Sequence, residues 1–305
     1  MSPYAYDNAS GIYTHNGKIF KQIWQNIPQL KPFYMEFENT YEIYNVQTWM
    51  IDNPFFPIMT VCFYLCFCYF GSRVMKSYKP LDLKYPLAIW NFILASFSAW
   101  GTFRTMPHLI FNIFHNSFES TVCEDPVSEW GIGATGFAVQ MFILSKFPEL
   151  IDTVFIVLKK KPLIFLHWYH HVTVLLYCWN AYVTEAGIGL YFVVMNYTVH
   201  SVMYFYYFLQ SIKVVPKWFP SWIITILQIS QMFIGMYVVG AAIYFYNYGG
   251  NEYPIHTCSN KMSNMIAGAV MYMSYATLFL MFAVERFVYG PKVNIKARLS
   301  TKKFE

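Results

Sequence analysis

The stretch LIFLHWYHHVTVLLYCWNAYV, residues 163–183, decides the fold, because its apolar run is long enough to cross a bilayer, which takes about 20 residues. It carries His167, His170 and His171, whose i, i+3 and i+4 spacing places three imidazoles on one face of a helix. Polar groups at membrane depth are costly and by default mark a functional site. The alternative is three core histidines satisfied by neighbouring helices. We disfavour it because one buried histidine is common and three together are not.

The composition of the whole chain agrees with a membrane protein. Of its 305 residues, 56% are hydrophobic and only 12% are charged, whereas soluble domains carry about 25% charged residues. The net charge of +5 does not indicate nucleic-acid binding, because the basic residues fall in short loops between apolar runs. We predict an all-α integral membrane protein with seven transmembrane helices, at 54–73, 86–114, 130–157, 163–183, 188–210, 218–247 and 264–289.

The third predicted span is interrupted by Lys146, Pro148, Glu149 and Asp152. Lipid does not tolerate charged groups or unsatisfied backbone, so these residues need protein partners. We therefore expect this helix to bend here or to lie inside the bundle.

The loops between the spans predict the orientation of the chain. Basic residues follow alternate spans, as with Lys159–Lys161 after the third and Lys213 with Lys217 after the fifth, and the loops between are acidic or nearly neutral. Cytosolic loops carry the excess of Lys and Arg. The C-terminus is therefore expected in the cytosol and the N-terminus on the opposite side.

Two short signals point to the endoplasmic reticulum membrane. The chain ends Lys302-Lys303-Phe304-Glu305, which looks like a di-lysine retrieval signal. The alternative is a basic tail that binds anionic lipid headgroups. Asn8 begins a glycosylation sequon on the expected lumenal side. We predict a lumenal segment at 1–53, a membrane domain at 54–290 and a cytosolic tail at 291–305.

The cysteines predict one disulfide. Cys123 and Cys258 fall in two different loops on the expected lumenal side, where the compartment permits disulfides. Cys62, Cys66 and Cys68 lie inside the first span, where small apolar filling is their default role. No cysteine spacing typical of a metal site is present.

Polar residues interrupt four of the apolar spans at similar depth. His170, Glu149, His200 and Gln228 each lie ~14–20 Å along their helices from the nearest cytosolic lysine, at ~1.5 Å per residue. Independent polar pairs need not share a depth, so we predict one chamber that opens to the cytosol. The four clusters are 146–153, 167–171, 200–207 and 225–231.

An imidazole in such a chamber can act as nucleophile, general base or metal ligand. Four histidines and two carboxylates could bind a di-iron pair, as in membrane desaturases and hydroxylases. Those enzymes carry several separate histidine boxes, whereas this chain has one box and His200, so we expect no metal. Cys178 lies on the same helical face as His171 and is a rival nucleophile. It lies ~10 Å further along the axis, toward the lumen.

At these four clusters the chain closely resembles the very-long-chain fatty acid elongase family, the membrane 3-oxoacyl-CoA synthases. The resemblance implies seven helices, six of them forming a barrel around a narrow tunnel. It also implies condensation of a long-chain acyl-CoA with malonyl-CoA to give a 3-oxoacyl-CoA two carbons longer, with no cofactor. The matching segments are Lys146–Thr153 (KxxExxDT), His167–His171 (HxxHH), His200–Tyr207 (HxxMYxYY) and Thr225–Gln231 (TxxQxxQ).

The resemblance implies that His170, the middle histidine of the box, carries the acyl group. His171 and His200 would stabilise the carbanion formed by malonyl decarboxylation or move protons. Glu149 and Asp152 would orient imidazole nitrogens, as a carboxylate fixes a histidine tautomer. The remaining expected site residues are His167, Lys146 as counter-charge, and a substrate-binding set of Gln228, Gln231, Tyr207, Tyr204 and Asn196.

The substrate and partners are less sharply predicted. The stretch around the histidine box looks like the branch that acts on saturated and monounsaturated acyl chains, with polyunsaturated chains as the main rival. Expected partners are membrane lipid and the 3-oxoacyl-CoA reductase, dehydratase and enoyl reductase of the elongation cycle; a homodimer stays open, and no nucleic acid is expected. A seven-span receptor or transporter would also explain the topology, but not the compact set of acids, bases and nucleophiles.

Overall fold

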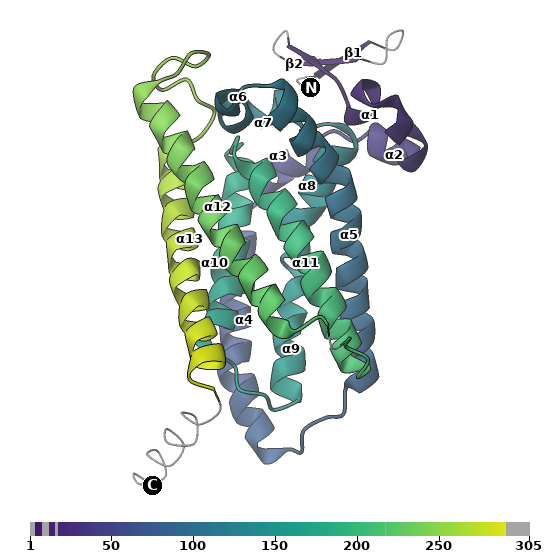
Figure 1. The fold of residues 1–305 in the computed structure, drawn as a ribbon, viewed down its shortest axis with the longest axis vertical. Helices are drawn as coiled ribbons and strands as arrows, with labels where there is room; N and C mark the ends of the chain where they lie inside the picture. The colour runs from purple at the N-terminus through teal and green to yellow at the C-terminus, as the bar shows by residue number, and fades with distance from the viewer. Residues whose placement is uncertain (1–3, 8–11, 16–17, 217, 291–305) are drawn as a thin grey trace.

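Long helices run side by side and build the body of the molecule, which we describe from a computed structural model (Figure 1). The structure describes residues 4–7, 12–15, 18–216 and 218–290. The sequon at Asn8 and the tail with Lys302 and Lys303 lie outside the described residues. The long elements are α4 (Phe55–Val74), α5 (Lys84–His115), α8 (Gly133–Ser145), α9 (Ile151–Leu158), α10 (Phe165–Val183), α11 (Gly189–Ser211), α12 (Ser221–Tyr248) and α13 (Met262–Ala283).

These helices follow the apolar runs of the sequence to within a few residues, and the all-α membrane character is confirmed. By length and apolar composition, three helical segments of the described chain could cross a membrane: Phe55–Ser77, Ser221–Tyr248 and Met262–Val288. Two of the polar clusters lie on α10 and α11, and the break at Pro148 leaves α8 and α9 with 13 and 8 residues, too short to cross a membrane singly.

The third predicted span is broken where the sequence indicated. Helix α8 ends at Ser145, a 3-10 turn η3 covers Pro148–Leu150, and α9 begins at Ile151. Pro148 stands at the start of the turn, where its missing N–H costs least. Lys146 and Glu149 are 3% and 4% exposed, so both charges point into the protein and not toward lipid.

The N-terminal segment covers one end of the bundle (Figure 1). It contains a three-stranded antiparallel sheet, which the sequence did not predict: β1 (Tyr4–Asp7), β2 (Ile12–His15) and β3 (Lys18–Phe20). Short helices follow: α1 (Ile23–Asn26), η1 (Pro28–Phe33), α2 (Glu36–Asn39) and α3 (Tyr44–Asp52). Glu38 is fully buried and pairs with Arg104 of α5 at 2.8 Å, which fastens this segment to the bundle.

A disulfide closes the same end of the molecule. It joins Cys123, the last residue of α6 (Phe118–Cys123), to Cys258 in the loop between α12 and α13, the pairing predicted from the sequence. Asn260 donates its side-chain N–H to the carbonyl of Val122 at 2.7 Å beside it. We call this the disulfide end. The opposite end, where Lys159–Lys161 follow α9, is the lysine end.

Candidate active site

One wide cavity collects residues from all four polar clusters. Its volume is about 870 Å³, which is within the range of small-molecule sites. Every residue predicted for the site lines it except Lys146, which is buried behind the wall. The lining residues from the four clusters are Glu149, Asp152, His167, His170, His171, His200, Met203, Tyr204, Tyr207, Gln228 and Gln231, joined by Asn196 of α11.

The lysine end forms the mouth of this chamber. Lys84 at the start of α5, Lys159 and Lys161 after α9, and Lys213 after α11 all line it. The helix ends that carry them lie at the lower end of the bundle in Figure 1. Asp82 also lines this end of the cavity, but four ammonium groups outnumber its carboxylate and favour a polyanionic ligand.

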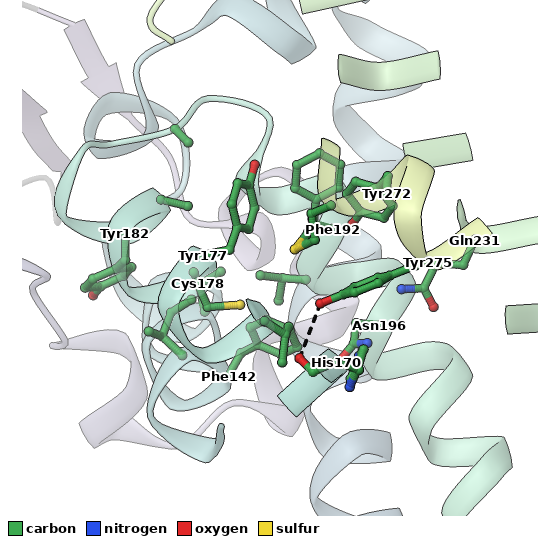
Figure 2. A pocket seen from close by; sticks show the side chains of 18 of the residues that line it. Phe142, His170, Tyr177, Cys178, Tyr182, Phe192, Asn196, Gln231, Tyr272 and Tyr275 are labelled. Carbon is green, nitrogen blue, oxygen red and sulfur yellow. Dashed lines mark hydrogen bonds between the residues drawn. The ribbon is translucent and has the colours of Figure 1, made fainter. Parts of the chain in front are cut away.

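A second, narrow cavity of about 60 Å³, which we call the apolar channel, lies beside the chamber on the side of the disulfide end. Its wall is mostly apolar and includes Phe142 and Phe192 (Figure 2), together with Trp130, Val139 and Met271. His170, Asn196, Gln231 and Met232 line both cavities. His170 therefore stands where the polar chamber meets the apolar channel.

The ring nitrogens of His170 are not engaged. In the described residues, side chains hydrogen-bond to His170 only at its backbone carbonyl, which accepts from the hydroxyl of Tyr275 at 3.3 Å (Figure 2) and from that of Thr173 at 3.4 Å. The two rings stand 5.0 Å apart between centroids. An imidazole held by its backbone, with free nitrogens facing a cavity, is available as a nucleophile.

The other imidazoles have fixed partners. Nε2 of His167 lies 2.9 Å from Oγ1 of Thr153. Nε2 of His200 accepts from Nδ2 of Asn196 at 3.2 Å, and the orientation of that amide is set because its Oδ1 accepts from the Lys146 ammonium at 3.3 Å. His200 therefore carries its proton on Nδ1. His171 packs with its ring 4.5 Å from that of His167.

In the described structure neither Glu149 nor Asp152 accepts a hydrogen bond from an imidazole, so the orienting role expected of these two carboxylates stays a prediction. Asp152 accepts from the indole N–H of Trp90 at 2.6 Å and from the Tyr204 hydroxyl at 2.7 Å. Glu149 accepts from Ser145 and from Lys146, each at 2.8 Å. The reason is local, because the broken turn sets Lys146 and Glu149 three residues apart on one face, where they pair.

The charge-balancing role expected of Lys146 fits its place. Its ammonium contacts the Glu149 carboxylate and lies 4.0 Å from the centre of the Phe142 ring. Asn196, expected to bind substrate, instead bridges Lys146 to His200, although it also lines both cavities.

The remaining predicted residues face the chamber or the channel. Gln228 donates to the sulfur of Met203 at 3.3 Å, and Gln231 is buried at the junction. Tyr204 is oriented by Asp152, and Tyr207 lines the chamber. Cys178 is buried and lines only the apolar channel, beyond His170 (Figure 2).

Sequence reasoning missed several partners of the site. Tyr275 of α13 and Thr173 of α10 contact the His170 carbonyl, Trp90 of α5 contacts Asp152, and Tyr64 of α4 reaches His167 through Thr153. A single tyrosine, tryptophan or threonine in an apolar span carries no spacing signal, so only the packing of the helices identifies these four.

No group of three or more His, Cys, Asp or Glu among the described residues is arranged to hold a metal ion. The histidines diverge to separate partners, Thr153 and Asn196 among them. A metal-free site remains a prediction for experiment.

Comparison with known proteins places this arrangement in context. The sequence model of the GNS1/SUR4 family matches residues 49–294. Very long chain fatty acid elongase 6 of Drosophila melanogaster is 40% identical over 255 residues, covering 82% of this chain and 78% of that protein. Fatty acid elongase 3 of Trypanosoma brucei brucei is 38% identical, covering 80% and 90%. Very long chain fatty acid elongase 6 of Homo sapiens is 34% identical, covering 86% and 96%.

Proposed function

Because this chain belongs to the GNS1/SUR4 family, whose members above are named fatty acid elongases, we propose that it is a condensing enzyme of fatty acid elongation. It joins a long-chain acyl-CoA to malonyl-CoA and releases carbon dioxide, CoA and a 3-oxoacyl-CoA two carbons longer. The observation that carries this proposal is the position of His170, whose side chain lines both the chamber and the apolar channel.

The two cavities suit the two halves of an acyl-CoA. The CoA phosphates would meet the lysines at the mouth, whose ammonium groups pair with phosphate oxygens. The acyl chain would enter the apolar channel, which at about 60 Å³ must widen to take a long chain, and its methylenes would leave water there. The thioester carbonyl then lies at the junction beside His170.

The first step transfers the acyl group to His170. A ring nitrogen attacks the thioester carbonyl, an N–C bond forms and the C–S bond breaks. CoA leaves as the thiolate and takes the proton that the other ring nitrogen loses. The product is an acyl-imidazole, an activated acyl donor held at the head of the channel.

The second step uses malonyl-CoA in the chamber. Loss of carbon dioxide leaves its electron pair as an enolate, which attacks the acyl carbon. The N–C bond breaks, and His170 takes a proton from water that enters from the lysine end. Charge develops on the malonyl thioester oxygen and needs a donor. His200 carries its proton on Nδ1 and lines the chamber, so it is our candidate, with His171 as a second.

We place the enzyme in the endoplasmic reticulum membrane with its C-terminus cytosolic. Seven segments would span the membrane, α8 and α9 together forming one, and six of the seven would surround the tunnel. Residues 1–53 would be lumenal, 54–290 the membrane domain and 291–305 the cytosolic tail. The reductase, dehydratase and enoyl reductase of the elongation cycle would consume the product in turn.

The activity is tested with microsomes that express the chain, supplied with labelled malonyl-CoA and a panel of acyl-CoAs, saturated, monounsaturated and polyunsaturated. Labelled 3-oxoacyl products two carbons longer are expected, and the preferred acyl-CoA identifies the substrate branch. Microsomes without the chain are the control. Metal-dependent oxygen consumption without chain extension would instead support a desaturase-like enzyme, and neither activity would favour a receptor or transporter.

Metal analysis is a separate test of the mechanism. We expect purified, active protein to contain far less than one iron or zinc per chain and to keep its activity after chelation. Elemental analysis by mass spectrometry measures this. One or two tightly bound ions per chain, removed together with activity, would overturn the acyl-imidazole proposal.

The closed end of the channel should limit the length of the acyl chain. Gly189 lines it, and an added Cβ would lie 3.6 Å from the ring of Trp130, so alanine fits and a larger side chain does not. Overpacking costs about 1–3 kcal/mol, so Gly189→Leu should weaken use of the longest acyl-CoA by about 5- to 150-fold and spare shorter ones. Product lengths measured by mass spectrometry decide this.

The matched control is Gly240→Leu, since a Cβ there meets nothing within 4 Å. It should leave the product distribution unchanged. An equal loss for every chain length in Gly189→Leu would show that the channel end does not select for length.

A further inference from the structure

Helix α4 places one hydroxyl group, that of Tyr64, in the interior of the protein. Its buried residues are Pro57, Val61 and Tyr64, which share one stripe at i, i+4 and i+7. The opposite face carries large exposed apolar side chains such as Phe63 and Phe70, as expected next to lipid. Tyr64 is only 5% exposed, and a buried phenol needs a hydrogen-bond partner.

The partner of Tyr64 is Thr153, which also contacts the histidine box. The Tyr64 hydroxyl lies 2.8 Å from Oγ1 of Thr153 on α9, and the same Oγ1 lies 2.9 Å from Nε2 of His167 on α10. Thr153 is fully buried. Three helices thus share one short chain of hydrogen bonds that ends on an imidazole of the chamber.

The distances alone do not give these bonds a direction, so we assign it from the protons available. Tyr64 and Thr153 each have one hydroxyl proton. The Tyr64 proton needs an acceptor, and Thr153 Oγ1 is the good one within reach, since the neighbouring Cys68 sulfur is a weak acceptor. Thr153 then donates its own proton to Nε2 of His167. In this arrangement Nε2 is unprotonated and the ring proton resides on Nδ1.

We propose that Tyr64 is a positioning residue that fixes the tautomer and ring orientation of His167 through Thr153. This inference rests on the proposed condensation at the histidine box. It gives α4, which carries none of the family-like motifs, a part in the reaction. Without the phenol, Thr153 can also accept from a protonated Nε2, so both tautomers of His167 become populated.

The size of the effect can be bounded. Partners that orient a histidine from outside the reacting groups are worth about 10- to 100-fold. Tyr64 acts through one intervening hydroxyl, so we expect Tyr64→Phe to lower kcat about tenfold, at the low end of that range. KM for acyl-CoA should change little, because Tyr64 does not line the chamber.

The test combines Tyr64→Phe, Thr153→Val and the double variant in full-length protein reconstituted in nanodiscs. Rates are divided by the number of chains that release CoA in the first turnover, which removes the effect of misfolded protein. If one chain of bonds is at work, the double variant should be no slower than Thr153→Val alone. Thr153→Ser keeps the hydroxyl and should recover much of the rate lost in Thr153→Val.

The matched control is Tyr69→Phe, at an exposed tyrosine on the same helix, which should keep the wild-type rate. Unchanged kcat in Tyr64→Phe, or losses that multiply in the double variant, would overturn the proposal. Nitrogen-15 chemical shifts of His167 report its tautomer whether or not the protein is active. A wild-type protein that makes no product would contradict the proposed function, while these shifts would still decide the role of Tyr64.

Discussion

Replacement of His170 by alanine should abolish both halves of the reaction. Wild-type protein given acyl-CoA without malonyl-CoA should release a stoichiometric burst of CoA and gain an acyl mass on the peptide that contains 167–171. His170→Ala should show no burst, no acyl mass, and condensation at least about 10³-fold slower, since loss of a nucleophile removes the covalent route. The fold should persist, because the ring nitrogens of His170 hold no other described residue in place.

The same experiment distinguishes His170 from its rival. Cys178 is buried in the apolar channel, where a thiolate is disfavoured. Cys178→Ala should therefore keep the burst and serves as the matched control. An acyl mass on Cys178, or a full burst from His170→Ala, would show that another residue carries the acyl group, and the elongation reaction would remain with a different nucleophile.

The sequence predicts the helices well because their signals are local. Apolar runs of membrane length and the breakers between them depend on neighbouring residues alone. The interruption of the third span at Lys146 and Pro148 could be predicted for the same reason, because its signal lies in neighbouring residues. The contact between Glu38 and Arg104 was not, because it joins a polar N-terminal segment to a helix 66 residues later, and neither residue has a spacing signal.

The sequence identified which residues line the site, but it did not identify which side chains they contact. The i, i+3 and i+4 histidines and the shared depth of four clusters identify the chamber. Which side chain each imidazole meets depends on the register between helices, which periodicity does not give. The imidazoles of His167 and His200 contact Thr153 and Asn196, and not the expected carboxylates. Asp152 instead accepts hydrogen bonds from Trp90 and Tyr204, and Glu149 pairs with Lys146.

Substitution of Lys146 by methionine should have the largest effect on stability. Its ammonium is 2.8 Å from the carboxylate of Glu149, and the two side chains are 2% and 5% exposed. Removal of one partner leaves a buried charge uncompensated, which costs about 3–5 kcal/mol. Lys146→Met should therefore lower the Tm of the detergent-purified protein strongly and reduce its yield.

The double variant Lys146→Met with Glu149→Leu separates stability from catalysis. Apolar side chains of similar volume can replace a buried ion pair with little loss, so the double variant should regain most of the Tm. Its activity should stay low, because Asn196 loses the ammonium that orients its amide, and the tautomer of His200 is no longer fixed. Thermal unfolding and the condensation rate are measured on the same preparations. If activity returned together with stability, the Lys146–Asn196–His200 connection would be structural only, and the stabilisation of the malonyl enolate would have to come from His171 or another group.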